Sequence, residues 1–318
     1  ENGGLGLDFG FNCVLCEELS YLGSSAGFTL QNDITANYIE RLGTEEQRAK
    51  YLPGMVSGDV ISAIAMTEPG AGSDLQGIRT TAIKDGNHLV VNGSKTYITN
   101  GQNADVIIVV AKTDPAQGAK GTSLVLVDAD AEGFERGRNL DKIGQHSADT
   151  SELFFNDVRV PMTNILGGEG RGFIHLMEEL PQERLIIAMG AMTGIEKALE
   201  VTMEFVKNRK AFGQTIWDFQ NTQFVLADLK AKGTAAKIFV NDCIAKHLKG
   251  ELDVPTACMA KYWVTELQGE VVDKCLQLHG GAGYINDYPI ARMFRDSRIT
   301  RIFGGSNEVM KMVIARSM

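Results

Sequence analysis

The spacing of hydrophobic and polar positions divides the chain into three segments. In the first segment, apolar side chains recur at helical spacing and predict helices over residues 11–22, 33–41 and 44–56. Thr44 and Gln47 have the spacing of a capping box at the start of the third helix, and Pro53 is expected to interrupt that helix. Residues 1–58 therefore predict an N-terminal helical domain.

The hydrophobic period changes at residue 59. An apolar run over residues 60–64 indicates a buried strand, and Asp85-Gly86-Asn87 is a turn signal between the two arms of a predicted hairpin, residues 81–83 and 88–93. Further strands are predicted over residues 106–111, 123–127, 152–155 and 158–161. Short strands separated by turn residues are typical of a β-barrel or sandwich, so residues 59–165 predict a middle β-domain.

Helical spacing returns after the Gly167–Gly168 pair and continues to the end of the chain. It predicts helices over residues 172–180, 183–209, 220–248, 255–279, 288–297 and 306–318. Long helices joined by short glycine-marked connections are typical of an antiparallel bundle, so residues 166–318 predict a C-terminal helical bundle. The three segments together indicate fold class α+β.

Composition and charge exclude several classes of protein. The chain of 318 residues carries a net charge of −9 and has no basic run interleaved with aromatic residues, which argues against a nucleic-acid surface. No apolar run is long enough for a membrane span, and we expect no signal peptide.

The chain has five cysteines, an odd number, and they lie in segments with helical spacing. Reduced thiols in an intracellular protein are therefore expected. Cys13 and Cys16 have the spacing of half a zinc site, but no second pair completes it, and a structural role is favoured.

The loop at residues 65–74 carries the first candidate chemistry. Pro69 ends the preceding strand, and Gly70 and Gly72 leave backbone N–H groups uncovered, while Thr67 and Ser73 add hydroxyls. Such a loop suits a flat polar ligand or a phosphate that approaches the main chain closely. The alternative is a tight turn whose glycines serve geometry only.

Three further blocks follow at residues 97–101 (Tyr-Ile-Thr-Asn-Gly), 209–213 (Arg-Lys-Ala-Phe-Gly) and 277–284 (Gln-Leu-His-Gly-Gly-Ala-Gly-Tyr). With residues 67–74, their order and spacing resemble the acyl-CoA dehydrogenase family of flavoenzymes over essentially the whole chain. The resemblance implies a partial N-terminal helical domain that lacks the helices usually found before it, a middle β-barrel domain and a C-terminal four-helix bundle.

The same resemblance implies FAD as cofactor, an acyl-CoA thioester as substrate and an electron-transferring flavoprotein as electron acceptor. It implies a homotetramer or homodimer, located in a bacterial cytoplasm or a mitochondrial matrix. The acyl chain is expected to be medium to long, or branched.

Residues that match the family's FAD contacts come from both the β-domain and the bundle. Thr67 would contact the pyrimidine side of the flavin and Thr99 the region near N5, although an ordinary strand hydroxyl is the alternative for Thr99. Arg209, Phe212 and Gln220 would reach the FAD of a neighbouring subunit. The full implied set is Met66, Thr67, Gly72, Ser73, Tyr97, Ile98, Thr99, Arg209, Phe212, Gln220, Gln277, Gly280, Gly281, Ser306 and Glu308.

The reaction implied by the resemblance transfers the α-proton of the thioester to a base and the β-hydrogen to flavin N5 as hydride. Many family members place the basic Glu just before Gly-Thr or Gly-Ser near the C-terminus, but that position is Gly304 here. A minority, the long-chain and isovaleryl enzymes, carry the base on a different helix, and the matching residue is Glu183. The alternative for Glu183 is an ordinary acid in the first turn after Pro181, and Glu308 is a less favoured candidate base.

Four residues are candidate contacts to the substrate. By the resemblance, Arg184 binds the CoA part and Ser73 reaches phosphate or pantetheine oxygens. The backbone N–H of Gly304, in the Gly304–Gly305 segment, would hydrogen-bond the thioester carbonyl and so form an oxyanion hole. His146 is a candidate catalytic histidine, but a solvent-contacting loop residue is favoured, and no histidine pair has metal-ligand spacing.

Two other functions remain open at this level. A flavin-dependent oxidase or monooxygenase on the same fold would use dioxygen. A non-catalytic relative that binds FAD or acyl-CoA without turnover is the other alternative, since Gly304 removes the usual base.

Overall fold

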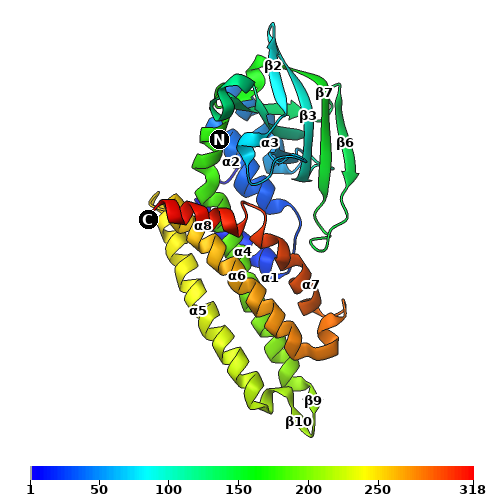
Figure 1. The fold of residues 1–318 in the computed structure, drawn as a ribbon, viewed down its shortest axis with the longest axis vertical. Coiled ribbons are helices and arrows are strands. Elements are labelled where there is room, and N and C mark those ends of the chain that lie inside the picture. The colour runs from blue at the N-terminus through cyan, green and yellow to red at the C-terminus, as the bar shows by residue number, and fades with distance from the viewer. Residues whose placement is uncertain (1) are drawn as a thin grey trace. The chain divides into compact units, whose positions relative to one another are not determined.

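The computed structural model describes residues 2–318, and these form two compact units (Figure 1). The sheet unit contains Ala26–Asp141 and His146–Leu180 together with the residues up to Leu7. The bundle unit contains Asp8–Ser25, Lys142–Gln145 and Pro181–Met318.

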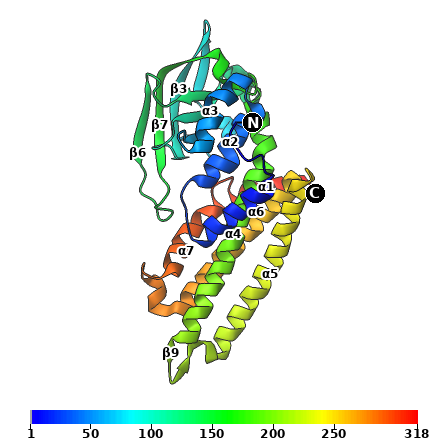
Figure 2. The same ribbon diagram turned by 180° about the vertical axis from the view of Figure 1, so that it is seen from behind.

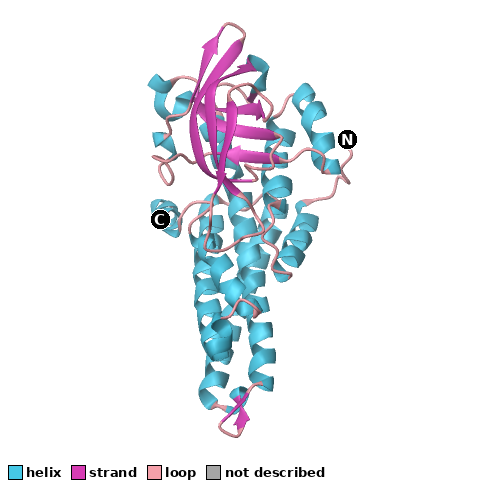
Figure 3. Cartoon of the chain, turned by 90° about the vertical axis from the view of Figure 1, so that its right-hand side faces the viewer, coloured by secondary structure: helices cyan, strands magenta, loops and turns pink. Residues whose placement is uncertain are grey.

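The sheet unit is built on eight strands, drawn in magenta in Figure 3. They are β1 (Ser62–Ala65), β2 (Thr81–Asp85), β3 (His88–Thr99), β4 (Val106–Lys112), β5 (Thr122–Asp128), β6 (Phe134–Asn139), β7 (Thr150–Pro161) and β8 (Ile165–Leu166). Their order is β6-β7-β3-β2-β4-β5-β8, with β1 parallel to β4. The predicted hairpin is confirmed as β2 and β3, in which Asp85 pairs with His88 across the turn.

Strand β4 shows how this sheet is buried on both faces. Ile107, Val109 and Ala111 pack into one apolar cluster with side chains of β3 and β7. Val106, Ile108 and Val110 alternate with them and pack into a second cluster with helix side chains. A strand covered on both faces loses the polar half of its alternation, which explains the continuous apolar run in the sequence.

The helices of the second cluster are α2 (Ala36–Leu42) and α3 (Glu45–Ser57), preceded by a π-helical turn at Leu30–Thr35. Thr44 and Gln47 form the predicted capping box, with bonds of 3.0 and 3.2 Å. The prediction that Pro53 interrupts α3 is wrong, because the helix continues to Ser57. Tyr51, Leu52 and Met55 are buried on either side of the proline, so packing outweighs the hydrogen bond that proline removes.

The bundle unit consists mainly of helices (Figure 2). They are α1 (Phe9–Tyr21), α4 (Gly172–Asn208), α5 (Gln220–Leu248), α6 (Val254–His279), α7 (Pro289–Ser297) and α8 (Asn307–Arg316), of which α4 begins in the sheet unit. A small hairpin of β9 (Lys210–Ala211) and β10 (Gln214–Thr215) follows α4. One apolar core joins side chains from α1, α4, α5, α6 and α7. The predicted α+β fold, with an N-terminal helical, a middle β-sheet and a C-terminal helical part, is confirmed.

Two helices predicted over residues 172–180 and 183–209 are a single helix, so that prediction is wrong. Pro181 lies inside α4, where the missing N–H leaves one bond of the helical ladder unmade. Leu185, Ala188, Met189 and Met192 are buried along the following turns, which fixes the chain in helical conformation despite the proline.

The cysteines and the apolar segments fit this interior. All five cysteine side chains are buried, and no disulfide forms among residues 2–318. Within the same residues, none of the helices combines the length and the hydrophobicity that a bilayer crossing requires.

Candidate active site

The loop after β1 folds back on itself and lies against the second half of β3. Glu68 and Ala71 form an isolated antiparallel bridge with N–H to O distances of 2.8 and 3.1 Å. The Thr67 hydroxyl donates to the Thr96 carbonyl, and the Thr96 N–H donates to the Thr67 carbonyl at 3.0 Å. These bonds place two of the predicted flavin-binding segments, residues 66–73 and 97–99, next to each other.

A buried ion pair between the loop and β3 holds this loop in place. The Lys95 ammonium lies 2.9 Å from a carboxylate oxygen of Glu68 and donates to the Met66 carbonyl at 2.9 Å. The Glu68 carboxylate also accepts the backbone N–H groups of Arg79 and Thr80 at 2.6 and 2.9 Å. Burial lowers the pKa of Lys95 to about 8, against the opposing effect of Glu68. Burial acts to raise the pKa of Glu68, but Lys95 and the hydrogen bonds outweigh it and lower that pKa, so the carboxylate is ionised.

The exposed part of the loop fits a flat ligand bound against the main chain. A Cβ atom added at Gly70 or Gly72 would meet no atom within 4 Å, so space is open beside both glycines. Tyr97 adopts a left-handed φ of 61°, which is strained for a residue with a Cβ, and its side chain is 69% exposed. Thr67 and Thr99 are half-buried.

The other members of the predicted set in the sheet unit differ in exposure. Ser73 is exposed, as the predicted phosphate or pantetheine contact requires. Ile98 is only 2% exposed and belongs to the sheet core, so a ligand could contact this residue only through its main chain. His146 lies exposed in the loop before β7.

In the bundle unit, α4 carries Glu183 and Arg184 side by side in its buried stretch. Glu183 is 7% exposed and Arg184 is 3% exposed. One Arg184 nitrogen, Nη1, donates to Cys258 Sγ of α6 at 3.1 Å. Burial lowers the pKa of Arg184, with Cys258 and Glu183 acting in the opposite direction, but a guanidinium stays charged at neutral pH.

The segment Gly304–Gly305 lies directly against the turn of α4 that follows Glu183. Both glycines have left-handed φ angles, 63° and 87°. A Cβ on Gly304 would stand 2.3 Å from Cδ1 of Ile187, which is four residues after Glu183. Positions four apart share one face of a helix, so the place from which a carboxylate at 304 would project adjoins the face that carries Glu183.

Glu308 has a different environment, in the exposed first turn of α8. Ser306 caps this helix by accepting the Val309 N–H at 3.4 Å. The backbone N–H of Glu308 itself, followed by the Ser306 hydroxyl, lowers the pKa of the Glu308 carboxyl. A carboxylate stabilised in this way is a weak base, which favours Glu183 over Glu308.

A cavity of about 450 Å³ lies at the end of the bundle unit where α4 and α6 end, and it is lined by Val201, Glu204, Phe205, Asn208, Arg209, His279, Tyr288 and Pro289. Its Arg209 and His279 come from the two sequence blocks at residues 209–213 and 277–284, so the fold brings these blocks together. The ring of Phe205 stacks on His279 at 4.2 Å, and His279 Nδ1 donates to the Cys275 carbonyl at 2.9 Å. Burial lowers the pKa of His279, so its ring is neutral at pH 7.

The remaining predicted cofactor residues near this cavity are exposed. Phe212, in the β9–β10 turn, is 94% exposed, and Gln220, Gln277, Gly280 and Gly281 are exposed as well. Arg209 directly follows the last residue of α4 and lies 26 residues after Glu183, a rise of about 39 Å at 1.5 Å per residue. Glu183 and Arg209 therefore belong to two separate ends of the bundle.

Comparison with known proteins identifies the family of this chain. The chain matches the N-terminal domain of acyl-CoA dehydrogenase over residues 1–59, the middle domain over residues 63–158 and the C-terminal domain over residues 170–318. The chain belongs to the acyl-CoA dehydrogenase family of flavoprotein oxidoreductases, and the resemblance predicted from the sequence is confirmed.

Individual relatives support the subgroup as well. The chain is 49% identical to the mitochondrial long-chain specific acyl-CoA dehydrogenase of Sus scrofa, over all of this chain and 74% of that protein. It is 35% identical to the mitochondrial isovaleryl-CoA dehydrogenase of Oryza sativa subsp. japonica, over all of this chain and 78% of that protein. The crystal structure of an acyl-CoA dehydrogenase from Geobacillus kaustophilus superimposes with a TM-score of 0.98 at 49% identity, covering 99% of this chain and 84% of the other.

Sequence reasoning missed the buried polar groups that support these segments. Lys95 and Glu68 hold the glycine loop, while Lys261 and Asn307 hold the segment Gly304–Gly305. The sequence offered one signal, a lysine at position 261 inside the apolar stretch of residues 257–264. No group of His, Cys, Asp and Glu side chains with the arrangement of a metal site occurs in residues 2–318.

Proposed function

We propose that this protein removes two hydrogens across Cα–Cβ of an acyl-CoA thioester and that Glu183 takes the α-proton. The observation that carries this proposal is the packing of Gly304 against Ile187, one helical turn after the buried Glu183. The glycine leaves the usual position of the base without a carboxylate. Glu183 offers a carboxylate from the helix face that the glycine contacts.

Two features of the surroundings of Glu183 support its role as the base. The neighbouring Arg184 cation favours the ionised carboxylate in the free enzyme. An acyl chain that covers Glu183 would remove water from the carboxylate and raise its basicity when the substrate is bound. The backbone N–H of Gly304 would donate to the thioester oxygen, on which negative charge grows as the α-C–H bond breaks.

FAD would supply the acceptor for the β-hydrogen and return to its oxidised form by passing electrons to an electron-transferring flavoprotein. The residues that would hold the flavin ring are Thr67, Tyr97, Thr99 and the main chain beside Gly72, while Ser306 and Glu308 are predicted contacts from the bundle. The open space beside Gly70 and Gly72 supports this assignment.

Arg209, Phe212, Gln220, Gln277, Gly280 and Gly281 would contact the FAD of a second subunit. The rise of about 39 Å between Glu183 and Arg209 supports this division, because it separates the base from these contacts along one rigid helix. Family members are typically tetramers, so a homotetramer is the assembly we propose.

Turnover of a series of straight and branched acyl-CoA substrates with an artificial electron acceptor tests the proposal. The wild-type protein with bound FAD should form the 2-enoyl-CoA, and Glu183→Gln should lower kcat about 10²–10⁴-fold at unchanged FAD content. Glu196→Gln, on the surface of α4, is the matched control with one carboxylate fewer. Glu308→Gln tests the less favoured base, and its pH profile should still be set by Glu183. Activity of Glu183→Gln above a tenth of the wild-type value would exclude Glu183 as the base.

Two results would instead support the alternatives. Rapid oxygen consumption by the reduced wild-type enzyme would favour an oxidase or monooxygenase. Tight binding of FAD and acyl-CoA without any enoyl product would favour a non-catalytic relative.

A further inference from the structure

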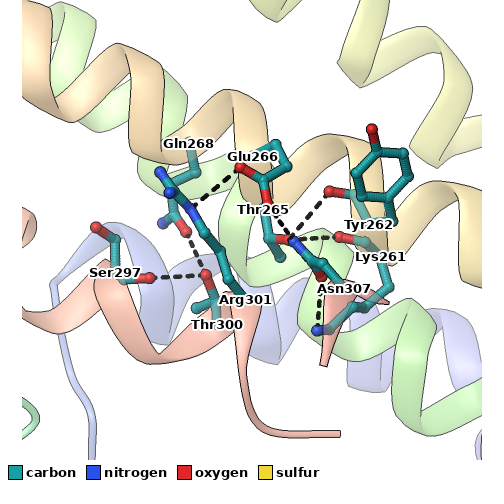
Figure 4. Close-up of polar contacts among 9 residues, drawn as sticks. All are labelled: Lys261, Tyr262, Thr265, Glu266, Gln268, Ser297, Thr300, Arg301 and Asn307. Atoms are coloured by element: carbon teal, nitrogen blue, oxygen red, sulfur yellow. Dashed lines mark hydrogen bonds and ion pairs between the residues drawn. The ribbon is translucent and has the colours of Figure 1, made fainter. Parts of the chain in front are cut away.

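The segment Gly304–Gly305 accepts a hydrogen bond from a buried lysine of α6. Figure 4 shows this lysine, Lys261, beside Asn307 and Thr265. Lys261 is fully buried, and its Nζ donates to the Gly305 carbonyl at 2.7 Å and to Asn307 Oδ1 at 2.9 Å. Asn307 is 1% exposed and donates to Thr265 Oγ1 at 3.0 Å and to Glu266 Oε1 at 2.7 Å. Thr265 Oγ1 donates to the Lys261 carbonyl at 2.7 Å, which ties these groups to one stretch of α6.

A second buried cation adjoins this group. Arg184 bonds to Cys258, and Cys258 lies three residues before Lys261, one turn earlier on α6. The Nε of Arg184 is buried and has no hydrogen-bond partner among residues 2–318. Over the same residues, neither Lys261 nor Arg184 has a carboxylate within 4.0 Å, so both cations are held by neutral acceptors.

Two buried cations without a carboxylate at ion-pair distance are expensive to desolvate, although Glu183 attracts Arg184 and Glu266 attracts Lys261 from farther away. Burial, followed by the charge of Arg184, lowers the pKa of Lys261 to about 8, although Glu266, Glu308 and Cys258 act to raise it. Such a cost is understandable where an anion forms during function, because the cations then stabilise the charge as it develops. The proposed reaction forms such an anion at the thioester oxygen next to Gly304.

We propose that Lys261 is a positioning residue for this reaction: it holds the main chain of Gly304–Gly305 so that the Gly304 N–H faces the thioester oxygen. With Arg184 it also provides the positive potential that stabilises the enolate. In the step concerned, the α-C–H bond breaks, the proton moves to the Glu183 carboxylate, and the electron pair forms the Cα=C1 bond. The carbonyl π electrons move to the thioester oxygen, which becomes anionic. This inference rests on the proposed function and adds to it a role for Lys261, which would not contact the substrate itself.

Exchange of the α-hydrogens of a 3-thiaacyl-CoA with D₂O, followed by NMR, tests this role without redox turnover. The sulfur at the β position leaves no β-hydrogen to transfer, so only proton removal and return are measured. Lys261→Met removes the charge and the hydrogen bonds, whereas Lys261→Gln keeps an N–H donor and removes the charge. Lys232→Met, an exposed lysine of α5 that pairs with Glu270 at 2.8 Å, is the control for loss of a lysine.

We expect Lys261→Met to lower the maximal exchange rate at least 30-fold and Lys261→Gln about tenfold. The concentration of analogue for half-maximal exchange should change less than threefold in both variants. Lys232→Met should exchange at the wild-type rate. A purely structural role would instead raise the half-maximal concentration and lower the thermal unfolding midpoint without a selective loss of maximal rate.

Maximal rates within twofold of wild type in both Lys261 variants would overturn the inference while leaving the proposed function intact. If Lys261→Met does not fold, the Lys261→Gln result decides by itself, and if neither folds the residue is structural and the inference fails. A wild-type protein that binds the analogue but exchanges none of its α-hydrogens would overturn the proposed function and this inference together.

Discussion

The contact between Gly304 and α4 is the geometry on which the displaced base depends, and Gly304→Ala tests it. The new Cβ would stand 2.3 Å from Ile187 Cδ1 and 3.8 Å from Ile187 Cγ1. The first distance is a severe overlap, and the second is an ordinary contact. Removal of the Cδ1 methyl by Ile187→Val should therefore create the space that the alanine needs.

The free energies of unfolding follow from two separate costs. A Cβ at a left-handed φ of 63° costs about 1–2 kcal/mol, whatever surrounds it. Overlap with the isoleucine methyl adds about 1–3 kcal/mol, because the side chain must leave its rotamer to avoid the alanine. Ile187→Val by itself should cost about 0.5–1.5 kcal/mol. In the Ile187→Val background only the backbone cost of Gly304→Ala should remain, so the coupling between the two changes is about 1–3 kcal/mol.

Urea unfolding of the wild type, both single variants and the double variant measures this coupling as a double-mutant cycle. Gly250→Ala is a matched control, since Gly250 has a φ of 71° in the same unit and its added Cβ meets no atom within 4 Å. That control should cost the backbone term of about 1–2 kcal/mol alone. Costs of Gly304→Ala that agree within about 0.3–0.5 kcal/mol in the two backgrounds would refute the contact, because independent sites are additive to that degree.

Three other outcomes follow from the charged residues of the two units. Lys95→Met should cost about 3–5 kcal/mol in urea unfolding, because Glu68 would stay buried without its cation; a loss below about 1 kcal/mol would contradict the pairing. Arg209→Ala should weaken FAD binding to the apoprotein at least tenfold in a fluorescence titration and leave the unfolding midpoint unchanged, since the side chain is exposed; unchanged affinity would remove Arg209 from the cofactor site. Lys261 has a folded pKa of about 8, below its ordinary 10.5, so the unfolded state binds more protons between these values and the contribution of Lys261 to stability rises with pH. The difference in stability between wild type and Lys261→Met should therefore increase from pH 8 to 10, and a flat or falling difference would contradict the low pKa.

The sequence predicted best the elements whose burial follows a regular period. Residues 220–248 were predicted as a helix, and α5 has the same limits, because its buried positions recur at helical spacing along its whole length. Strand β6 was missed, since Phe134–Asn139 is mostly exposed and shows no apolar alternation. Pro53 and Pro181 were given too much weight as helix breakers, because the packing of their neighbours is not visible in a local pattern.

Only the candidate residues that would contact a ligand were predictable from the sequence, and the buried residues that support them were not. Glu183 and Gly304 were found by matching motifs, but the contact of residue 304 with Ile187 joins positions 117 residues apart in the chain. Lys95 and Lys261 were not found, because lysine is usually a surface residue and its buried partners come from other elements. A sequence pattern identifies residues that contact a ligand more readily than residues that support them.

The proposed reaction depends on which carboxylate takes the α-proton, and rapid mixing under anaerobic conditions tests the identity of this base. The fading of flavin absorbance during the first turnover with a saturating acyl-CoA reports the step that includes loss of the α-proton. Wild-type protein and Glu196→Gln, a surface variant of α4 whose glutamate pairs with Lys237 at 2.8 Å, should reduce their flavin at similar rates. Glu183→Gln, at equal FAD content and with bound acyl-CoA, should be slower by a factor of about 10²–10⁴. Flavin reduction in Glu183→Gln at a rate close to the wild-type value, or a loss of about 10²–10⁴-fold in Glu308→Gln alone, would exclude Glu183 as the base.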